Sequence, residues 1–317
     1  MFGNIFIITL PIFIIILIGF FAVRLSVFPK DGARALGIFV VNFGIPAILF
    51  KALSERSFED LSHLDFVTVY AIGALIPFFA VFVIARFIKR NALSRSSMMA
   101  MGSCFPNTLM IGYPVLLQVF GSAALIPLTL ALLVENFLLL PLTVALADSG
   151  KGTKGGVLES VRKILFQVLS NPFILAIALG ALFSLLEISL PQSINKVIDM
   201  FAATVGAVAL FAIGAVLAGI KIRGFLSDVS IVVVAKLMLH PLCIFALLLL
   251  FPDMEPLLLA SVLILASLPM LSIYGVIGQK YGEAELCSAA ILPATLISFI
   301  SINLILYYLH QSGHIPL

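Results

Sequence analysis

The strongest constraint on this chain of 317 residues is a series of long apolar runs that recurs from one end to the other. A helix needs about 20 mostly apolar residues to cross the hydrocarbon core of a bilayer. Only 10% of the residues are charged and 62% are hydrophobic, whereas soluble domains carry about 25% charged residues. The pattern therefore predicts an all-α polytopic membrane protein, and it argues against a soluble enzyme, a nucleic-acid binder and a disordered chain.

Ten segments are apolar enough to be predicted as transmembrane helices, and the sixth of them is short for a full crossing. The expected spans are 5–23, 35–53, 66–85, 97–120, 123–146, 172–186, 197–220, 229–251, 256–278 and 286–308.

Basic residues in the connections alternate between the two sides of the predicted helices. Three of them, Lys51, Arg56 and Lys196, flank one side, and fourteen flank the other. Because basic residues favour the cytoplasmic side of a membrane, we expect both termini to lie outside the cytoplasm. The fourteen are Arg24, Lys30, Arg34, Arg86, Lys89, Arg90, Arg95, Lys151, Lys154, Arg162, Lys163, Lys221, Arg223 and Lys280.

The two halves of the chain resemble each other at a spacing of roughly 161 residues. With five spans in each half, the second half would enter the membrane from the opposite side, which is an inverted repeat typical of secondary transporters. We expect a first repeat over 1–147, a cytoplasmic linker over 148–165 and a second repeat over 166–317. The aligned pairs are Pro11 and Pro172, Gly19 and Gly180, Pro29 and Pro191, Pro106 and Pro269, and the segments 118–125 and 279–286.

A proline stands near the centre of the fourth and of the ninth predicted span, at Pro106 and Pro269. Proline removes a backbone donor and clashes with the carbonyl four residues earlier, so it breaks or kinks a helix. Two breaks at matching depth predict discontinuous helices that meet at the midplane and present N-terminal ends suited to an anionic group. Two ordinary proline kinks are the alternative.

Residues 105–114, Phe-Pro-Asn-Thr-Leu-Met-Ile-Gly-Tyr-Pro, resemble the fourth-span motif of the auxin efflux carrier family. That family includes plant PIN-type carriers and bacterial malate- or malonate-permease-like proteins. Leu-Pro at 268–269 with Gln-Lys-Tyr-Gly at 279–282 is similar to the ninth-span motif, and 42–46 fits the second-span pattern. The resemblance covers essentially the whole chain. Met270 stands where the plant carriers have a polar residue, and their long cytoplasmic loop is absent, which points to a short bacterial inner-membrane type.

This resemblance implies ten transmembrane helices in two inverted five-helix repeats, an architecture similar to that of bile-acid symporters and NhaA. Spans 1, 2, 6 and 7 would form a scaffold, and the others a transport domain whose broken helices 4 and 9 cross. It also implies elevator-type transport of a small organic anion, with Asn107 contacting a substrate carboxylate. The expected partners are that anion and the lipid bilayer, and no nucleic acid is expected. Coupling to H⁺ or Na⁺ and assembly into a homodimer are both left open.

Ionisable side chains are costly inside a bilayer, about 2.5–3.5 kcal/mol at the centre of a helix, so each one needs a role. Glu135 lies at the middle of the fifth span and is a candidate proton-coupling carboxylate, with a structural acid as the alternative. Lys236 could pair with Glu135 or with a substrate anion, although snorkelling to the interface is favoured. His240 could relay protons, and a packing role is favoured there.

Asn107 is the first candidate ligand contact, because Ser and Thr side chains can bond to their own helix backbone and an Asn in apolar surroundings is expected not to. The further candidate substrate contacts are Pro106, Thr108, Ser103, Asn42, Ser267, Pro269, Met270, Ser272 and Tyr274.

The sequence contains no zinc-protease helix, no nucleophile elbow and no phosphate-binding loop. Its three cysteines, Cys104, Cys243 and Cys287, show neither a disulfide framework nor a metal-ligand spacing. We therefore expect a transporter without cofactor or metal, and not an enzyme. A sodium-coupled symporter of the bile-acid type and a transporter-like sensor or intramembrane enzyme remain the alternatives.

Overall fold

The computed structural model describes residues 2–54, 63–149, 170–220 and 224–315. Within these ranges the regular secondary structure is helical, and one isolated bridge pairs Pro106 with Met270. Seven helical stretches are long and apolar enough to cross a membrane, and two shorter apolar helices, α10 (Pro172–Leu185) and α14 (Pro256–Ser267), accompany them. The described chain therefore has the helical, multi-pass character that the apolar runs predicted.

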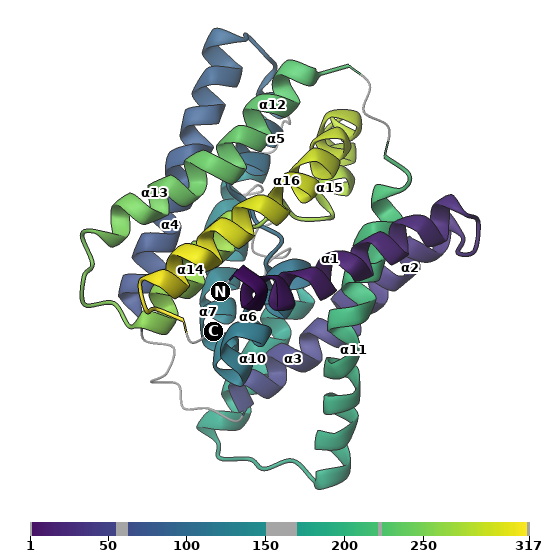
Figure 1. Cartoon of the computed structure of the whole chain (residues 1–317), viewed down its shortest axis with the longest axis vertical. Coiled ribbons are helices and arrows are strands. Elements are labelled where there is room, and N and C mark those ends of the chain that lie inside the picture. Colours follow the sequence, from purple (N-terminus) through teal and green to yellow (C-terminus); the bar gives the residue numbers. More distant parts are fainter. Residues whose placement is uncertain (1, 55–62, 150–169, 221–223, 316–317) are drawn as a thin grey trace.

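One group of helices, here called bundle A, occupies the lower right of Figure 1. α1 packs along α11, α3 packs along α10, and α2 also contacts α11. Bundle A consists of α1 (Phe2–Arg24), α2 (Lys30–Phe39), η1 (Val40–Gly44), α3 (Ile45–Ser54), α10 and α11 (Gln192–Leu217).

The other described helices form bundle B, most of which lies at the upper left of Figure 1. α4 packs against α5 and α13, α5 packs against α8, and α16 packs against α14 and α15. Bundle B consists of α4 (Leu64–Val83), η3 (Ile84–Ile88), α5 (Leu93–Cys104), η4 (Thr108–Gly112), α6 (Tyr113–Phe120), η5 (Gly121–Ala124), α7 (Leu125–Val134), η6 (Glu135–Leu139), α8 (Leu140–Ser149), α12 (Leu226–Val234), η7 (Ala235–Leu239), α13 (His240–Leu248), α14, α15 (Tyr274–Lys280) and α16 (Ala284–Gln311).

Close backbone contact joins the helices of bundle A at two corresponding places. A Cβ atom at Gly19 of α1 would lie 2.1 Å from the carbonyl oxygen of Phe211 in α11, and one at Gly180 of α10 would lie 2.7 Å from that of Phe50 in α3. Small residues allow membrane helices to approach this closely. Gly19 and Gly180 are an aligned pair of the predicted repeat, and Phe50 and Phe211 stand at the same spacing.

Both predicted helix interruptions are present. α5 ends at Cys104 and helix resumes at Thr108, while α14 ends at Ser267 and α15 begins at Tyr274. Pro106 and Pro269 lie in these two breaks, where neither has to fit inside a helix.

The predicted linker differs at its start from what was expected. α8 ends at Ser149, so the first two residues of the predicted segment 148–165 are helical. The rest of that segment falls within 150–169, outside the described residues.

Candidate functional site

The two helix breaks contact each other and form a single junction. The backbone N–H of Asn107 donates to the carbonyl oxygen of Pro269 at 2.8 Å, and Pro106 forms an antiparallel bridge with Met270. Backbone groups freed from a helix inside a membrane protein must find partners in the protein or in a water-filled cavity. Here the carbonyl of the second break is the partner of an N–H group in the first.

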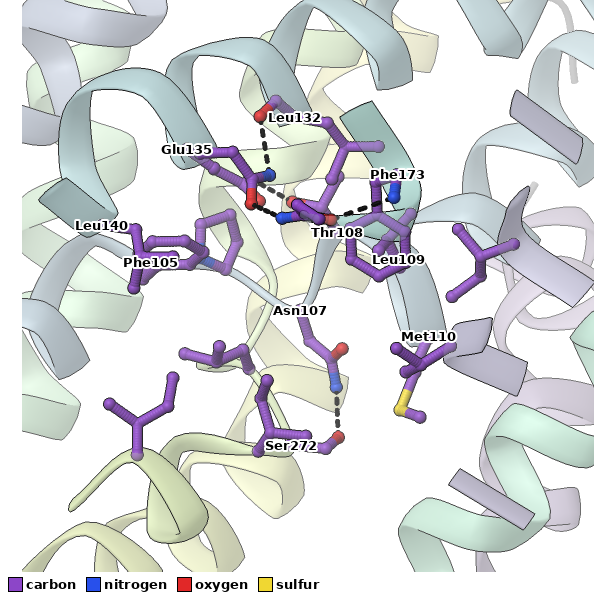
Figure 2. Close-up of a pocket in the computed structure, with 18 residues that line it drawn as sticks. Phe105, Asn107, Thr108, Leu109, Met110, Leu132, Glu135, Leu140, Phe173 and Ser272 are labelled. Carbon is purple, nitrogen blue, oxygen red and sulfur yellow. Dashed lines mark hydrogen bonds between the residues drawn. The ribbon is translucent and has the colours of Figure 1, made fainter. Parts of the chain in front are cut away.

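A cavity of about 160 Å³ lies beside this junction (Figure 2). Its walls come from both breaks, from η6 and the residues flanking it, from the start of α10, and from η1 and α3. Five of the residues proposed from the sequence line it together: Pro106, Asn107, Thr108, Glu135 and Ser272.

Helical segments begin beside this cavity after both breaks. The first hydrogen bond of η4 runs from the N–H of Ile111 to the carbonyl of Asn107 at 3.1 Å, so the N–H groups of residues 108–110 precede it. Likewise, the N–H of Ile277 bonds to the carbonyl of Ile273 at 3.0 Å at the start of α15. First-turn N–H groups have no partner within their helix, and they carry partial positive charge. Residues 108–110 and Ile273 all line the cavity.

The side chain of Asn107 points across the junction to the opposite break (Figure 2). Its Nδ2 donates to the Oγ of Ser272 at 2.6 Å, and Asn107 is 5% exposed. The amide and the hydroxyl thus hold each other in place at the cavity wall, and both carry hydrogen-bond donors that a bound molecule can use.

Glu135 is buried on the other side of the Asn107 backbone, next to Thr108 (Figure 2). Its Oε1 accepts a hydrogen bond from the hydroxyl of Tyr70 in α4 at 2.6 Å and another from the hydroxyl of Thr108. Among the described residues that line the cavity, Glu135 is the one ionisable side chain. The arrangement holds a carboxyl group in a fixed position beside the space that a ligand would occupy.

Four of the polar residues named from the sequence lie in π-helical segments, namely Asn42 in η1, Thr108 in η4, Glu135 in η6 and Lys236 in η7. Such segments bulge a helix locally and are frequent at functional sites. The π-helical segments therefore occur in the same helices as these polar residues.

Lys236 is fully buried and points into bundle B. Its ammonium donates to the carbonyl oxygen of Ala266 at 2.8 Å and lies 3.0 Å from Nδ1 of His240. Ala266 belongs to the last turn of α14, where a cation complements the partial negative charge of the helix end. The expectation that Lys236 snorkels to the interface is wrong, and the described ion pairs do not join it to Glu135.

His240 is also fully buried, and its Nε2 has no hydrogen-bond partner among the described residues. Neither His240 nor Lys236 lines the cavity. The structure therefore places both behind the junction and not on the cavity wall.

Several other proposed contacts are buried near the junction but off the cavity. Ser103 donates to the carbonyl of Pro77 at 3.1 Å, Ser267 to that of Ile264 at 2.7 Å, and the Tyr274 hydroxyl to that of Met98 at 2.6 Å. Their polar groups bond to backbone carbonyls inside bundle B. Pro269 and Met270 belong to the junction backbone and likewise do not line the cavity.

Asn42 lies on the exposed side of η1, and its Nδ2 donates to the carbonyl of Ile38 at 3.0 Å. Asn136 makes the same kind of bond to Leu132 at 2.9 Å. The premise that an Asn in apolar surroundings is not satisfied by its own helix is therefore wrong, since both bond to the carbonyl four residues earlier.

Three polar residues at or beside the cavity were not proposed from the sequence. They are Tyr70, which bonds to Glu135, and the pair Asn136 and Asn171, which line the cavity and bond to each other at 2.7 Å. Asn171 precedes Pro172 at the start of an apolar run, a helix-capping signal that could have drawn attention to it. Nothing in the local sequence around Tyr70 points to Glu135.

A family model described as "Membrane transport protein" matches residues 4–306. The chain belongs to this family, the auxin efflux carrier family. This membrane transport protein is 31% identical over 312 residues to a "Putative malonate transporter" of Rhizobium meliloti (strain 1021), with 97% of this chain and 96% of the relative covered. It is 26% identical over 239 residues to the "Uncharacterized transporter YfdV" of Escherichia coli (strain K12), covering 74% and 75%.

A third relative is the "Lysosomal cholesterol signaling protein" of Mus musculus, 26% identical over 250 residues, which are 74% of this chain and 28% of the relative. The family membership predicted from the fourth- and ninth-span motifs is confirmed, and the protein is a membrane transporter and not an enzyme.

Proposed function

We propose that this protein is a secondary transporter that moves small organic anions, chiefly carboxylates, by elevator-type alternating access. The observation that carries the proposal is the junction of two interrupted helices, with helix N-terminal ends and the amide of Asn107 facing one cavity.

The cavity offers donors without offering a full positive charge. The described lining residues include no Lys, Arg or His, so an anion would be held by hydrogen bonds and by the helix ends. A helix N-terminus carries roughly half a positive charge, and hydrogen bonds from amides to a carboxylate are charge-assisted and strong. Asn107 and Ser272 would turn their donors from each other to the substrate.

Short dicarboxylates are the proposed substrates. The relative that is 31% identical over nearly the full chain carries the description "Putative malonate transporter". The donors of Asn107 and Ser272, which come from opposite breaks, also suit a molecule with more than one carboxylate oxygen to bind.

The inverted repeat is supported by corresponding contacts in both halves. The approach of Gly19 to Phe211 is matched by that of Gly180 to Phe50, and the two junction prolines face each other's break. Ten helices in two inverted five-helix repeats would then give the protein a pseudo-two-fold axis through the junction. With basic connections placed in the cytoplasm, both termini lie outside, as in a bacterial inner membrane.

The elevator mechanism is supported by how the helices group. α10 and α11 pack with α1 and α3 in bundle A, although the chain between α3 and α10 forms much of bundle B. The junction and most of the cavity wall belong to bundle B. Bundle B would carry the substrate while bundle A stays in place.

Glu135 is proposed to couple transport to protons. An anionic substrate next to an ionised carboxylate would be repelled, so a proton on Glu135 would accompany the substrate. Lys236 and His240 would act behind the junction, where the ammonium neutralises the end of α14 and leaves no need for a sodium ion.

The test is uptake by purified protein in liposomes, with a panel of dicarboxylates and monocarboxylates and with H⁺ or Na⁺ gradients imposed separately. We expect at least one short dicarboxylate to accumulate when a proton gradient is imposed, and no dependence on Na⁺. Liposomes without protein are the control.

Accumulation driven by Na⁺ would favour a symporter of the bile-acid type. Measurable binding of an anion without movement of any anion would overturn the proposal in favour of a sensor.

A further inference from the structure

A hydrogen bond between two asparagines joins the bundles at the edge of the cavity. Asn171, at the start of α10 in bundle A, donates from Nδ2 to Oδ1 of Asn136 in η6 of bundle B at 2.7 Å. Both side chains line the cavity, and Asn136 follows Glu135 in the sequence.

Each amide is held in one orientation by its own backbone. The Oδ1 of Asn171 accepts the N–H of Phe173 at 2.9 Å and caps α10, which leaves Nδ2 to face bundle B. The Nδ2 of Asn136 donates to the carbonyl of Leu132 at 2.9 Å, which leaves Oδ1 to face bundle A. Because a backbone N–H can only donate and a carbonyl can only accept, this is the orientation in which all three bonds form.

Asn171 is the one polar side chain that bundle A contributes to the described cavity lining. The other lining residues from bundle A are Val41, Ile45 and Phe173. In such surroundings, a hydrogen bond that is broken and not replaced leaves polar groups without partners at considerable cost. The pair therefore favours the arrangement of bundles seen here.

We propose that Asn171 is a positioning residue that latches bundle A to Asn136 of bundle B, and that a substrate carboxylate releases the latch by taking over the Nδ2 donor. This inference rests on the proposed elevator mechanism. A carboxylate accepts a stronger hydrogen bond than an amide oxygen does, so it competes effectively for that donor. Occupation of the cavity would thereby free bundle B to move.

The variants are chosen to remove this bond and little else. Asn171→Ser keeps a capping oxygen of equal quality for α10 but is too short to reach Asn136. Asn136→Leu removes the acceptor from the other side and keeps the same number and branching of side-chain heavy atoms. Thr143→Val is the matched control, because Thr143 lies in the helix that continues from η6. Its hydroxyl donates to the carbonyl of Leu139 at 2.8 Å, a bond that stays within bundle B.

The readout is a single cysteine at Ile277, which lines the cavity, in a protein whose three native cysteines are replaced by alanine. A membrane-impermeant thiol reagent is applied from each side in turn, without any substrate. Loss of one neutral hydrogen bond should change the ratio of the two labelling rates about two- to tenfold. We expect this change in Asn171→Ser and in Asn136→Leu, no further change in the double variant, and none in Thr143→Val.

Independent, additive effects of the two substitutions, or a ratio that stays as in the parent protein, would overturn the latch. Malonate, used as a short dicarboxylate, should shift the ratio in the parent protein and have a smaller effect in Asn171→Ser. If the labelling ratio is unchanged in the variants and uptake is intact, the latch proposal is wrong and the proposed function stands. If the ratios change as expected but the protein moves no anion, the latch proposal stands and the proposed function is wrong.

Discussion

At the scale of single residues, the cavity depends on polar side chains that come from distant parts of the chain. Asn107 and Ser272 approach from the two breaks, and Glu135 is held by Tyr70 and Thr108. None of these bonds joins neighbours within one helix turn. Substitutions at these residues are therefore expected to separate substrate binding from proton coupling.

Asn107→Ala should weaken substrate binding about ten- to a hundredfold, because a hydrogen bond to a charged group contributes about 1.5–3 kcal/mol. Calorimetric titration of purified protein with the transported dicarboxylate measures this loss. Ser103→Ala is the matched control, since Ser103 is buried close to the break but off the cavity. Equal affinities in Asn107→Ala and the parent protein would place the site elsewhere.

Glu135→Gln should abolish accumulation driven by a proton gradient while leaving substrate exchange across the membrane intact. The glutamine oxygen can still accept the bonds from Tyr70 and Thr108, but the side chain cannot take up and release a proton. Uptake under an imposed pH gradient, compared with counterflow at equal pH, separates the two effects. Full gradient-driven accumulation in the variant would exclude Glu135 as the coupling group.

At the scale of elements, close backbone contact between helices is a feature of bundle A. A Cβ atom at Gly214 of α11 would lie 1.8 Å from the carbonyl oxygen of Ile16 in α1, whereas one at Gly206 of the same helix would meet nothing within 4 Å. The two glycines share a helix but only one of them lies where another backbone approaches.

Gly214→Ala should lower the free energy of unfolding by about 1–3 kcal/mol, the usual cost of overpacking. Gly206→Ala should raise it by up to about 1 kcal/mol, since alanine favours the helix over glycine. Thermal unfolding in detergent, followed by circular dichroism, compares the pair. Similar shifts in both variants would mean that the contact with α1 does not limit stability.

At the scale of the whole molecule, polar side-chain bonds join the two bundles at two places, and each bond pairs a residue of one proposed repeat with a residue of the other. Thr9 of α1 bonds to Asn303 of α16 at 2.9 Å, and Asn171 bonds to Asn136. At the repeat spacing, the counterpart of Asn136 is Ile297, six residues before Asn303. The register between bundles therefore differs between the halves, and six residues of helix correspond to about 9 Å.

If the halves exchange environments during transport, bundle B should slide by roughly 9 Å along bundle A, and Thr9 should then lie near residue 297. In the cysteine-free protein, cysteines at Thr9 and Asn303 should cross-link in the state seen here. Cysteines at Thr9 and Ile297 should cross-link in the other state, to an extent that changes with the substrate gradient. A second pair that never cross-links under any gradient would rule out a slide of this size.

The two helix breaks were predictable from the sequence because a proline interrupts its own helix whatever that helix packs against. The contacts around the cavity were not, since Asn107 and Ser272 stand 165 residues apart and Tyr70 and Glu135 stand 65 apart. Lys236 was misplaced for a similar reason. Its burial depends on where α14 ends, because the free carbonyl of Ala266 supplies the partner that the interface would otherwise supply.

The sequence by itself determined that this is a helical membrane protein, that two helices are interrupted, and that it belongs to a transporter family. These properties follow from local chemistry: apolar length, proline and short motifs act within one helix. Only the tertiary structure decided which groups of the two breaks bond to each other, that Glu135 and Asn136 share a cavity with Asn107, and that Asn171 reaches it from bundle A. Those contacts depend on how helices pack, and packing sums many weak interactions across the whole chain.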